Sequence, residues 1–159
     1  MEERHKVLVV DDELDIREAL QELLELIDLE VVTASSGREA LELMGLMGDE
    51  LRLIVSDYRM PGMDGLEFLA KAEKLRPKVA RVLVTAYAET TLAVRAVNEA
   101  RIARFLSKPI EPALMEGMVK ELIAAGQAER NRTAAMERTL DLLKKREAGA
   151  DPKKGAPPS

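Results

Sequence analysis

The sequence contains no cysteine, no tryptophan and only one histidine. Without cysteine, the chain can form no disulfide, no thiolate zinc site and no cysteine nucleophile. We interpret the one histidine, His5, as a solvated residue before the first strand rather than as a ligand or a base. Aromatic residues make up 3% of the chain and apolar residues 47%. A core must therefore be built from leucine, valine, isoleucine, methionine and alanine.

Long apolar runs are also missing. No run approaches the length that spans a membrane, and the first residues, M-E-E-R-H-K, lack the apolar stretch of a signal peptide. We therefore expect a cytoplasmic protein without membrane contact. The net charge of −5 is uneven, with 16 basic and 24 acidic residues in 1–127 against 8 and 5 in 128–159. Because the body is acidic and the tail only weakly basic, we expect no direct DNA binding by this chain.

Two hydrophobic periods alternate along most of the chain. Short apolar runs typical of buried strands occupy residues 6–10, 30–33, 51–56, 80–85 and 103–107. Helical spacing begins after each run, with start signals at Leu14, Ser35/Ser36, Asp64, Thr90/Thr91 and Glu111/Pro112. This alternation predicts an α/β fold, in which a doubly wound, five-stranded parallel sheet has helices on both faces and right-handed crossovers.

The composition changes towards the C-terminus. We predict one domain over residues 1–126, a helical extension over 127–147, which lacks glycine and proline, and a disordered, breaker-rich tail over 148–159. The fifth helix is expected to bury Leu114, Met118, Leu122 or their neighbours against the sheet. We also expect it to continue without a break into the extension.

An apolar patch lies in the extension at alternating three- and four-residue spacing. It consists of Met136, Leu140 and Leu143, and the same spacing fails further upstream. Polar residues or glycine occupy the corresponding positions Gly126, Glu129 and Thr133. Two interpretations remain open. In one, the patch packs on a second copy of the chain or on another protein. In the other, the helix is a linker to a missing domain.

Polar residues end four of the five predicted strands. In an open parallel sheet, functional groups gather beyond the carboxyl ends of the strands. The residues at these ends are Asp11, Asp12, Asp57, Thr85 and Lys108. Three neighbouring carboxylates must bind a cation or shift their pKa values. Oxygen ligands without histidine or cysteine are typical of a site for Mg²⁺ or a similar divalent ion.

This set of residues is suited to phosphoryl transfer. Lys108 can bind one phosphoryl oxygen as a point charge, and the Thr85 hydroxyl can donate a hydrogen bond to another. A carboxylate beside Mg²⁺ can act as the nucleophile and form an acyl phosphate. We therefore predict that Asp57 becomes phosphorylated.

Four motifs carry a family resemblance. They read V-L-V-V-D-D-E at 7–13, L-I-V-S-D-Y-R-M-P-G-M-D-G at 53–65, V-L-V-T-A-Y at 82–87 and F-L-S-K-P at 105–109. In this combination and order, they resemble the receiver domain of two-component response regulators over roughly residues 5–125. The resemblance implies a flavodoxin-like fold with strand order 2-1-3-4-5. It also implies a signalling protein, not classed as an enzyme, that takes a phosphoryl group from a sensor histidine kinase or phosphotransfer protein.

The resemblance assigns roles around the metal ion. Asp57 is the implied phosphoacceptor and, with Asp12, a direct Mg²⁺ ligand. The backbone carbonyl of Arg59 is the implied third protein ligand, and Asp11 acts through water. Lys108 matches the family's lysine, and the Lys108–Pro109 bond is expected to be cis.

Other residues match the family's switch. Thr85 corresponds to the switch hydroxyl, Ala86 to the small residue beside it, and Phe105 to the aromatic that turns inward when Thr85 moves. The face of the fourth helix, fifth strand and fifth helix would then control an output protein that the sequence does not name. Arg59 and Tyr87 are large, and either shape the access of water to the site or are simply exposed.

Three alternatives remain open. The chain can be a fragment of a longer regulator whose output domain is missing. It can be a phosphorylation-independent interaction module. It can also be a haloacid-dehalogenase-type phosphatase, which uses an aspartate nucleophile with Mg²⁺, although Arg59 stands where such enzymes place a second acid.

Overall fold

The computed structural model describes residues 5–86 and 90–149, and the predicted sheet is present in it. Its strands are β1 (Lys6–Val10), β2 (Glu30–Ala34), β3 (Leu51–Asp57), β4 (Ala80–Thr85) and β5 (Arg104–Ser107). They lie in the order β2-β1-β3-β4-β5, and each neighbouring pair is parallel. The predicted strand order and the predicted fold class are therefore confirmed.

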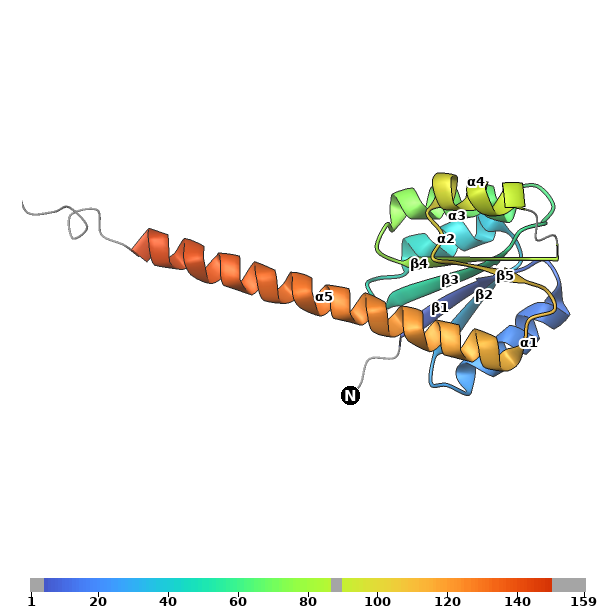
Figure 1. The fold of residues 1–159 in the computed structure, drawn as a ribbon, viewed down its shortest axis with the longest axis horizontal. Coiled ribbons are helices and arrows are strands. Elements are labelled where there is room, and N and C mark those ends of the chain that lie inside the picture. Colours follow the sequence, from blue (N-terminus) through green and yellow to red (C-terminus); the bar gives the residue numbers. More distant parts are fainter. Residues whose placement is uncertain (1–4, 87–89, 150–159) are drawn as a thin grey trace, which may run out of the picture. The chain divides into compact units, whose positions relative to one another are not determined.

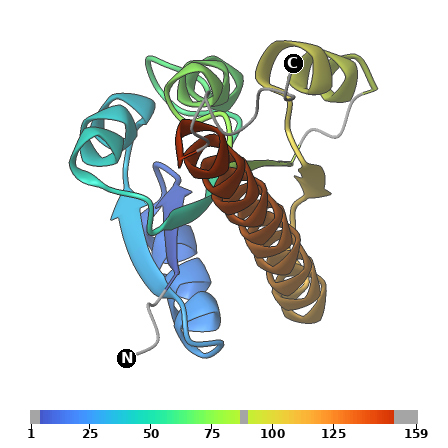
Figure 2. The same cartoon turned by 90° about the vertical axis from the view of Figure 1, so that its left-hand side faces the viewer.

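The helices cover both faces of this sheet. They are α1 (Leu14–Glu25), α2 (Gly37–Leu46), α3 (Gly65–Leu75), α4 (Thr90–Ala100) and α5 (Pro112–Gly149). Figure 1 shows α2, α3 and α4 on one face of the sheet, and α1 with the first turns of α5 on the other. Figure 2 shows α2 (cyan), α3 (green) and α4 (olive) side by side along their face. This two-sided cover leaves the carboxyl ends of the strands free to form a site.

Two of the predicted helix start signals act as caps. The Ser36 hydroxyl accepts a hydrogen bond from the Glu39 amide at 3.1 Å, and the Asp64 carboxylate accepts one from the Glu67 amide at 2.8 Å. Each bond satisfies an amide that has no partner within its own helix. The side chains of Ser36 and Asp64 thereby set where α2 and α3 begin.

The sheet separates two hydrophobic cores. One packs β-strand residues such as Leu8 and Ile54 against Phe68 and the rest of α2, α3 and α4. The other packs the opposite side chains of the strands against α1 and α5, with Leu24 and Met115 fully buried. Alternate residues of each central strand thus enter different cores, as expected for a sheet that is buried on both faces.

The expected burial of Leu114 is wrong. Its side chain is 57% exposed, whereas Met115, Met118 and Val119 are buried and Leu122 is partly buried against the core. The buried residues follow the spacing i, i+3, i+4, i+7 of one helix face. Leu114 lies one residue, or about 100°, away from that face.

The chain divides into two units, Met1–Gly126 and Gln127–Ser159. Helix α5 is continuous from Pro112 to Gly149, as expected, and ends two residues beyond the predicted position 147. The three residues of the apolar patch, Met136, Leu140 and Leu143, are about half exposed or more. Most of the predicted tail, residues 150–159, lies outside the described residues. The predicted roles of the extension and the tail stay predictions.

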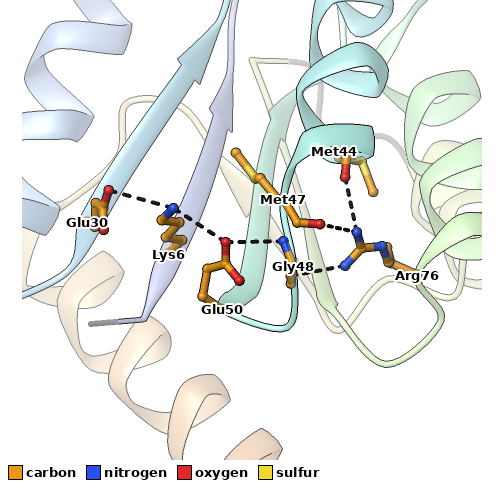
Figure 3. A network of polar contacts seen from close by, with 7 residues as sticks. All are labelled: Lys6, Glu30, Met44, Met47, Gly48, Glu50 and Arg76. Atoms are coloured by element: carbon orange, nitrogen blue, oxygen red, sulfur yellow. Dashed lines mark hydrogen bonds and ion pairs between the residues drawn. The ribbon is translucent and has the colours of Figure 1, made fainter. Parts of the chain in front are cut away.

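At the amino ends of the strands, a network of polar groups joins the loops (Figure 3). Lys6 Nζ lies 3.8 Å from the Glu30 carboxylate and 3.4 Å from that of Glu50, which also accepts a bond from the Gly48 amide at 3.1 Å. The Arg76 guanidinium donates to the carbonyls of Met44 in the last turn of α2 and of Met47 and Gly48 directly after that helix. Lys6 and Arg76 at this end of the sheet thus have partners of opposite charge or carbonyl acceptors.

Candidate functional site

The carboxyl ends of the central strands bring the predicted acidic residues together. Val10 of β1 is in register with Ser56 of β3, so Asp11 and Asp57, the next residue on each chain segment, are neighbours. Asp57 is the last residue of β3, and both carboxylates are buried, with 2% exposure for Asp11 and 7% for Asp57. Asp12 is exposed. One carboxylate oxygen from each of the three aspartates lies within 4.8 Å of the others.

Lys108 is the cationic partner of two of these carboxylates. Its Nζ lies 3.0 Å from an oxygen of Asp57 and 3.2 Å from an oxygen of Asp11. The Lys108 amide donates to the Thr85 carbonyl at 2.8 Å, which ties the segment after β5 to the end of β4. The Lys108–Pro109 peptide is cis, as the resemblance implies. The ammonium group is thus held by the carboxylates of Asp11 and Asp57.

The ionisation of the Asp57–Lys108 pair reflects both burial and charge. Burial raises the pKa of Asp57, and the nearby Asp11 carboxylate raises it further, while Lys108 opposes both effects. Burial alone would lower the pKa of Lys108, but its hydrogen bond to Asp57 and the two carboxylates outweigh this and raise that pKa. Lys108 is therefore held in its charged form, whereas the charged form of Asp57 lacks full compensation.

The donor set fits a hard divalent cation. Three carboxylates face one ammonium group, so negative charge is in excess at this point. All the converging donors are oxygens, which Mg²⁺ prefers over softer ligands. Asp11, Asp12 and Asp57 could therefore hold such an ion. Arg59 lies in the loop after β3, and the role of its carbonyl as a ligand stays a prediction.

Gly65, which was not among the predicted site residues, shapes the wall of the site. Its amide donates to the Tyr58 carbonyl at 2.7 Å, at the first residue of α3. A Cβ atom at this position would lie 1.9 Å from the Asp57 carbonyl oxygen. Only glycine lets α3 approach the phosphoacceptor candidate so closely. The dipeptide D-G at the start of a helix was the signal that could have revealed it.

The predicted switch residues lie on two neighbouring strands. Thr85 is 1% exposed at the end of β4, and its register partner on β5 is Ser107. Phe105 precedes Ser107 by two residues, so its side chain leaves the sheet on the same face as that of Thr85. Phe105 is half-buried and packs against the core on the side of α2, α3 and α4. Ala86 is exposed, and Tyr87 lies outside the described residues.

Two contacts of Asp11 were not predicted from the sequence. One oxygen of its carboxylate accepts a bond from the Glu13 amide at 2.9 Å, and its backbone carbonyl accepts one from Arg17 Nη1 at 2.7 Å. Arg17 lies on the second turn of α1 and is half-buried. The spacing of six residues between Asp11 and Arg17 did not lead us to predict this contact.

The fold and the acidic set define a CheY-like α/β domain. A family model described as the response regulator receiver domain matches residues 7–120. The chain therefore belongs to the receiver domain family of two-component systems. Such domains are signalling modules that work with histidine kinases.

Three known proteins illustrate the likeness. The C4-dicarboxylate transport transcriptional regulatory protein DctD of Rhizobium meliloti is 36% identical over 131 residues, which are 82% of this chain and 26% of that protein. A CheY-like receiver domain protein from Methanospirillum hungatei has a TM-score of 0.75 at 29% identity, covering 79% of this chain and 98% of the other. The response regulator TrrA from Thermotoga maritima, in complex with Mg²⁺–BeF, has a TM-score of 0.66 at 30% identity, covering 74% and 98%.

The first curated relatives are much longer than this chain, which spans about a quarter of their length. Their activities beyond the receiver domain are therefore no finding about this protein. Within residues 5–86 and 90–149, none of the helices combines the length and the apolarity that a membrane crossing needs.

Proposed function

We propose that this chain accepts a phosphoryl group on Asp57 from a sensor histidine kinase or phosphotransfer protein, in a Mg²⁺-dependent reaction. The observation that carries the proposal is the position of Lys108, whose Nζ contacts the carboxylates of both Asp11 and Asp57. Asp12 adds a third carboxylate, which is exposed and lies close enough to the other two to bind one metal ion together with them. The site thus combines a buried nucleophile, a fixed ammonium group and a set of carboxylates that could hold a cation.

Each residue has a distinct part in the transfer. When bound, Mg²⁺ would be held by Asp12, Asp57 and the Arg59 carbonyl, with Asp11 acting through water, and would offset the charge of the phosphoryl oxygens. A carboxylate oxygen of Asp57 forms the new bond to phosphorus. The phosphorus–nitrogen bond of the donor phosphohistidine breaks, and its electron pair returns to the imidazole nitrogen. Lys108 binds a phosphoryl oxygen, and its raised pKa keeps it charged throughout.

The proposed reaction is tested by phosphorylation with a small donor. The full chain is incubated with Mg²⁺ and acetyl phosphate and its intact mass is measured. We expect at most one added phosphoryl group per chain, stable in acid and labile in base. Asp57→Asn should abolish it, and Asp15→Asn, an exposed aspartate on α1, should not. Equal labelling of the Asp57→Asn variant would rule out the assignment.

The same experiment separates a receiver from a dehalogenase-type phosphatase. A receiver accumulates the phosphorylated form, whereas a phosphatase consumes many equivalents of donor without accumulating it. A phosphorylation-independent module would acquire no label and show no Mg²⁺-dependent spectral change. The excess of carboxylates over ammonium groups at the site favours the receiver function, because a module without a cation would gain nothing from it.

Phosphorylation would be read out through Thr85 and Phe105. The phosphoryl group brings charge and acceptor oxygens beside Lys108 and Thr85. Movement of Thr85 towards it vacates space that Phe105, on the same face of the sheet, can occupy. The surface of α4, β5 and the start of α5 would change and control a protein partner. A Thr85→Ala variant that keeps the full phosphorylation-dependent change in the amide spectra of residues 90–120 would refute this coupling.

The extension would serve as a self-pairing element or as a linker to an output domain. The exposed patch of Met136, Leu140 and Leu143 supports pairing, and the polar residues upstream of it support a linker. Truncation after Gln127 should leave phosphorylation intact and weaken self-association. Equal sedimentation of the full and truncated chains, with and without phosphorylation, would eliminate pairing and leave the linker function.

A further inference from the structure

Arg17 holds the segment that carries the two acidic residues after β1. Its Nη1 donates to the Asp11 carbonyl at 2.7 Å, and its own amide donates to the Glu13 carbonyl at 3.1 Å. A hydrogen bond from a charged donor at this distance is among the stronger ones in proteins. The side chain therefore folds back from the second turn of α1 and closes the loop that begins at Asp11.

Asp11 is held at each of its polar groups. Its amide donates to the Ala34 carbonyl at 3.1 Å, and its two carboxylate oxygens accept bonds from the Glu13 amide and from Lys108. The bond from Arg17 to the carbonyl completes this set. As a result, the hydrogen bond from Arg17 to the Asp11 carbonyl fixes the orientation of the peptide plane between Asp11 and Asp12.

Asp12 is held very differently. It is exposed, and no hydrogen bond or ion pair of its side chain is found within residues 5–86 and 90–149. The direction in which its carboxylate points is therefore set by the backbone that precedes it. That backbone is the peptide whose oxygen Arg17 holds.

Arg17 also acts on the start of α2. The Glu39 carboxylate accepts bonds from the Ser35 hydroxyl at 2.8 Å and the Ser35 amide at 3.1 Å. The pKa of Glu39 is lowered, first by the Ser35 hydroxyl and to a smaller extent by the charge of Arg17. The positive charge of Arg17 thus contributes a little to keeping Glu39 ionised, whereas its hydrogen bond goes to the Asp11 carbonyl in the loop after β1.

We propose that Arg17 is a positioning residue for the cation site, because it fixes the peptide between Asp11 and Asp12 and so presents the Asp12 carboxylate to the ion. The inference rests on the proposed function only in taking Mg²⁺ as the ion. The direction in which Mg²⁺ affinity changes when Arg17 is replaced tests this proposal. Removing a positive charge near three carboxylates strengthens cation binding by Coulomb attraction. Loss of a positioning bond weakens it, because Asp12 must then be ordered when the ion binds.

The test is the equilibrium affinity of the full chain for Mg²⁺ without a phosphodonor, measured by isothermal titration calorimetry. Arg17→Met keeps much of the aliphatic stem and removes the donor, and Arg17→Gln removes the charge but keeps a shorter amide. We expect about tenfold weaker binding for Arg17→Met, the equivalent of one lost hydrogen bond, and a smaller loss for Arg17→Gln. Arg17→Lys, which keeps the charge and one donor group, should recover part of the affinity. The matched control is Arg38→Ala, which removes an exposed charge at the start of α2 and should change affinity less than twofold.

A double-mutant cycle shows whether Arg17 acts through Asp12. On an Asp12→Ala background, Arg17→Met should cause little further loss of Mg²⁺ affinity, because the residue that it positions is gone. An equal fold-loss on both backgrounds would overturn the proposal, as would Mg²⁺ affinity that is unchanged or higher in the Met and Gln variants that fold. Melting temperatures in EDTA identify variants that fail to fold. Since no phosphoryl transfer is measured, these outcomes do not depend on whether Asp57 is the phosphoacceptor.

Discussion

The two ends of the sheet differ in how their charged groups are paired. At the amino end, Lys6 lies between Glu30 and Glu50, and the Arg76 guanidinium is shared among three carbonyls (Figure 3). At the carboxyl end, three carboxylates lie together, and the ammonium group of Lys108 pairs with two of them, those of Asp11 and Asp57. The amino-end carboxylates are also more exposed, at 49% and 35%, than Asp11 and Asp57, at 3% and 8% for their side chains.

This contrast shows how a folded domain separates stability from function. Charges that are paired and partly hydrated contribute little to stability and cost little. Buried carboxylates in excess of their partners cost free energy, unless something outside the chain supplies the missing positive charge. The carboxyl end therefore has an excess of negative charge that a bound cation can offset, whereas the amino end does not.

The largest expected effect concerns the backbone of the carboxyl end. In Gly65→Ala, the new methyl group would collide with the Asp57 carbonyl, which is backbone and cannot turn away. We expect the free energy of unfolding to fall by about 3 kcal/mol or more, measured by urea denaturation. The matched control is Gly45→Ala in α2, where a Cβ atom meets nothing within 4 Å. That variant should gain up to about 1 kcal/mol, because alanine favours a helix over glycine. Equal stability of the two variants would contradict the close approach at Gly65.

An intermediate effect is expected from removing one lysine at each end. Lys108→Met leaves two buried carboxylates without their partner and should cost about 2 kcal/mol in the absence of divalent ions, since Asp57 can offset part of the loss by binding a proton. Lys6→Met removes partly exposed ion pairs and should cost less than about 1 kcal/mol. Urea denaturation at neutral pH measures both. Similar losses in the two variants would remove the distinction between the two ends.

The smallest expected effect is a change in melting temperature, which should have opposite signs for carboxylates at the two ends of the sheet. The pKa of Asp57 is raised by burial, so its charged form costs stability above its folded-state pKa, and this cost disappears as the pH falls below the ordinary value of 3.8. Asp57→Asn should therefore raise the melting temperature by a few degrees at neutral pH and leave it unchanged in acid.

The pKa of Glu50 is lowered, chiefly by backbone hydrogen bonds with smaller effects from Lys6, so its charged form stabilises the fold above its ordinary pKa. Glu50→Gln should lower the melting temperature slightly at neutral pH, and the loss should vanish as the pH falls through the folded-state pKa. Calorimetric melting curves across this pH range check both variants. A lower neutral-pH melting temperature for Asp57→Asn would contradict the account of its burial.

Much of the fold was predictable because the local signals agree. The strands Lys6–Val10 and Ala80–Thr85 have the predicted bounds, since their apolar runs are flanked by polar or breaker residues. The caps Ser36 and Asp64 also act as predicted. The buried face of α5 was mistaken at Leu114, because several apolar residues in a row fit more than one helix face. The packing of the sheet, which is not local, selects Met115 instead.

The candidate site was predictable because its residues lie at the ends of strands. Asp11, Asp57 and Lys108 each follow or end a strand, and parallel strands bring such residues to one edge. The contact of Arg17 was not predictable, because it depends on how a side chain folds back, and the D-G dipeptide at the start of α3 marks Gly65 without showing how closely two backbones approach there. Neither property leaves a periodic trace in the sequence.

The most direct test of the central claim is to locate the phosphoryl group. The full chain is phosphorylated with acetyl phosphate and Mg²⁺ and then treated with borohydride, which reduces an acyl phosphate to an alcohol and so converts the modified aspartate to homoserine. Peptide mass spectrometry then identifies the residue. The account predicts homoserine at position 57 in a Mg²⁺-dependent yield, and none in samples without donor. Homoserine at Asp11 or Asp12 instead, or none in chains that carry the phosphoryl group, would contradict it.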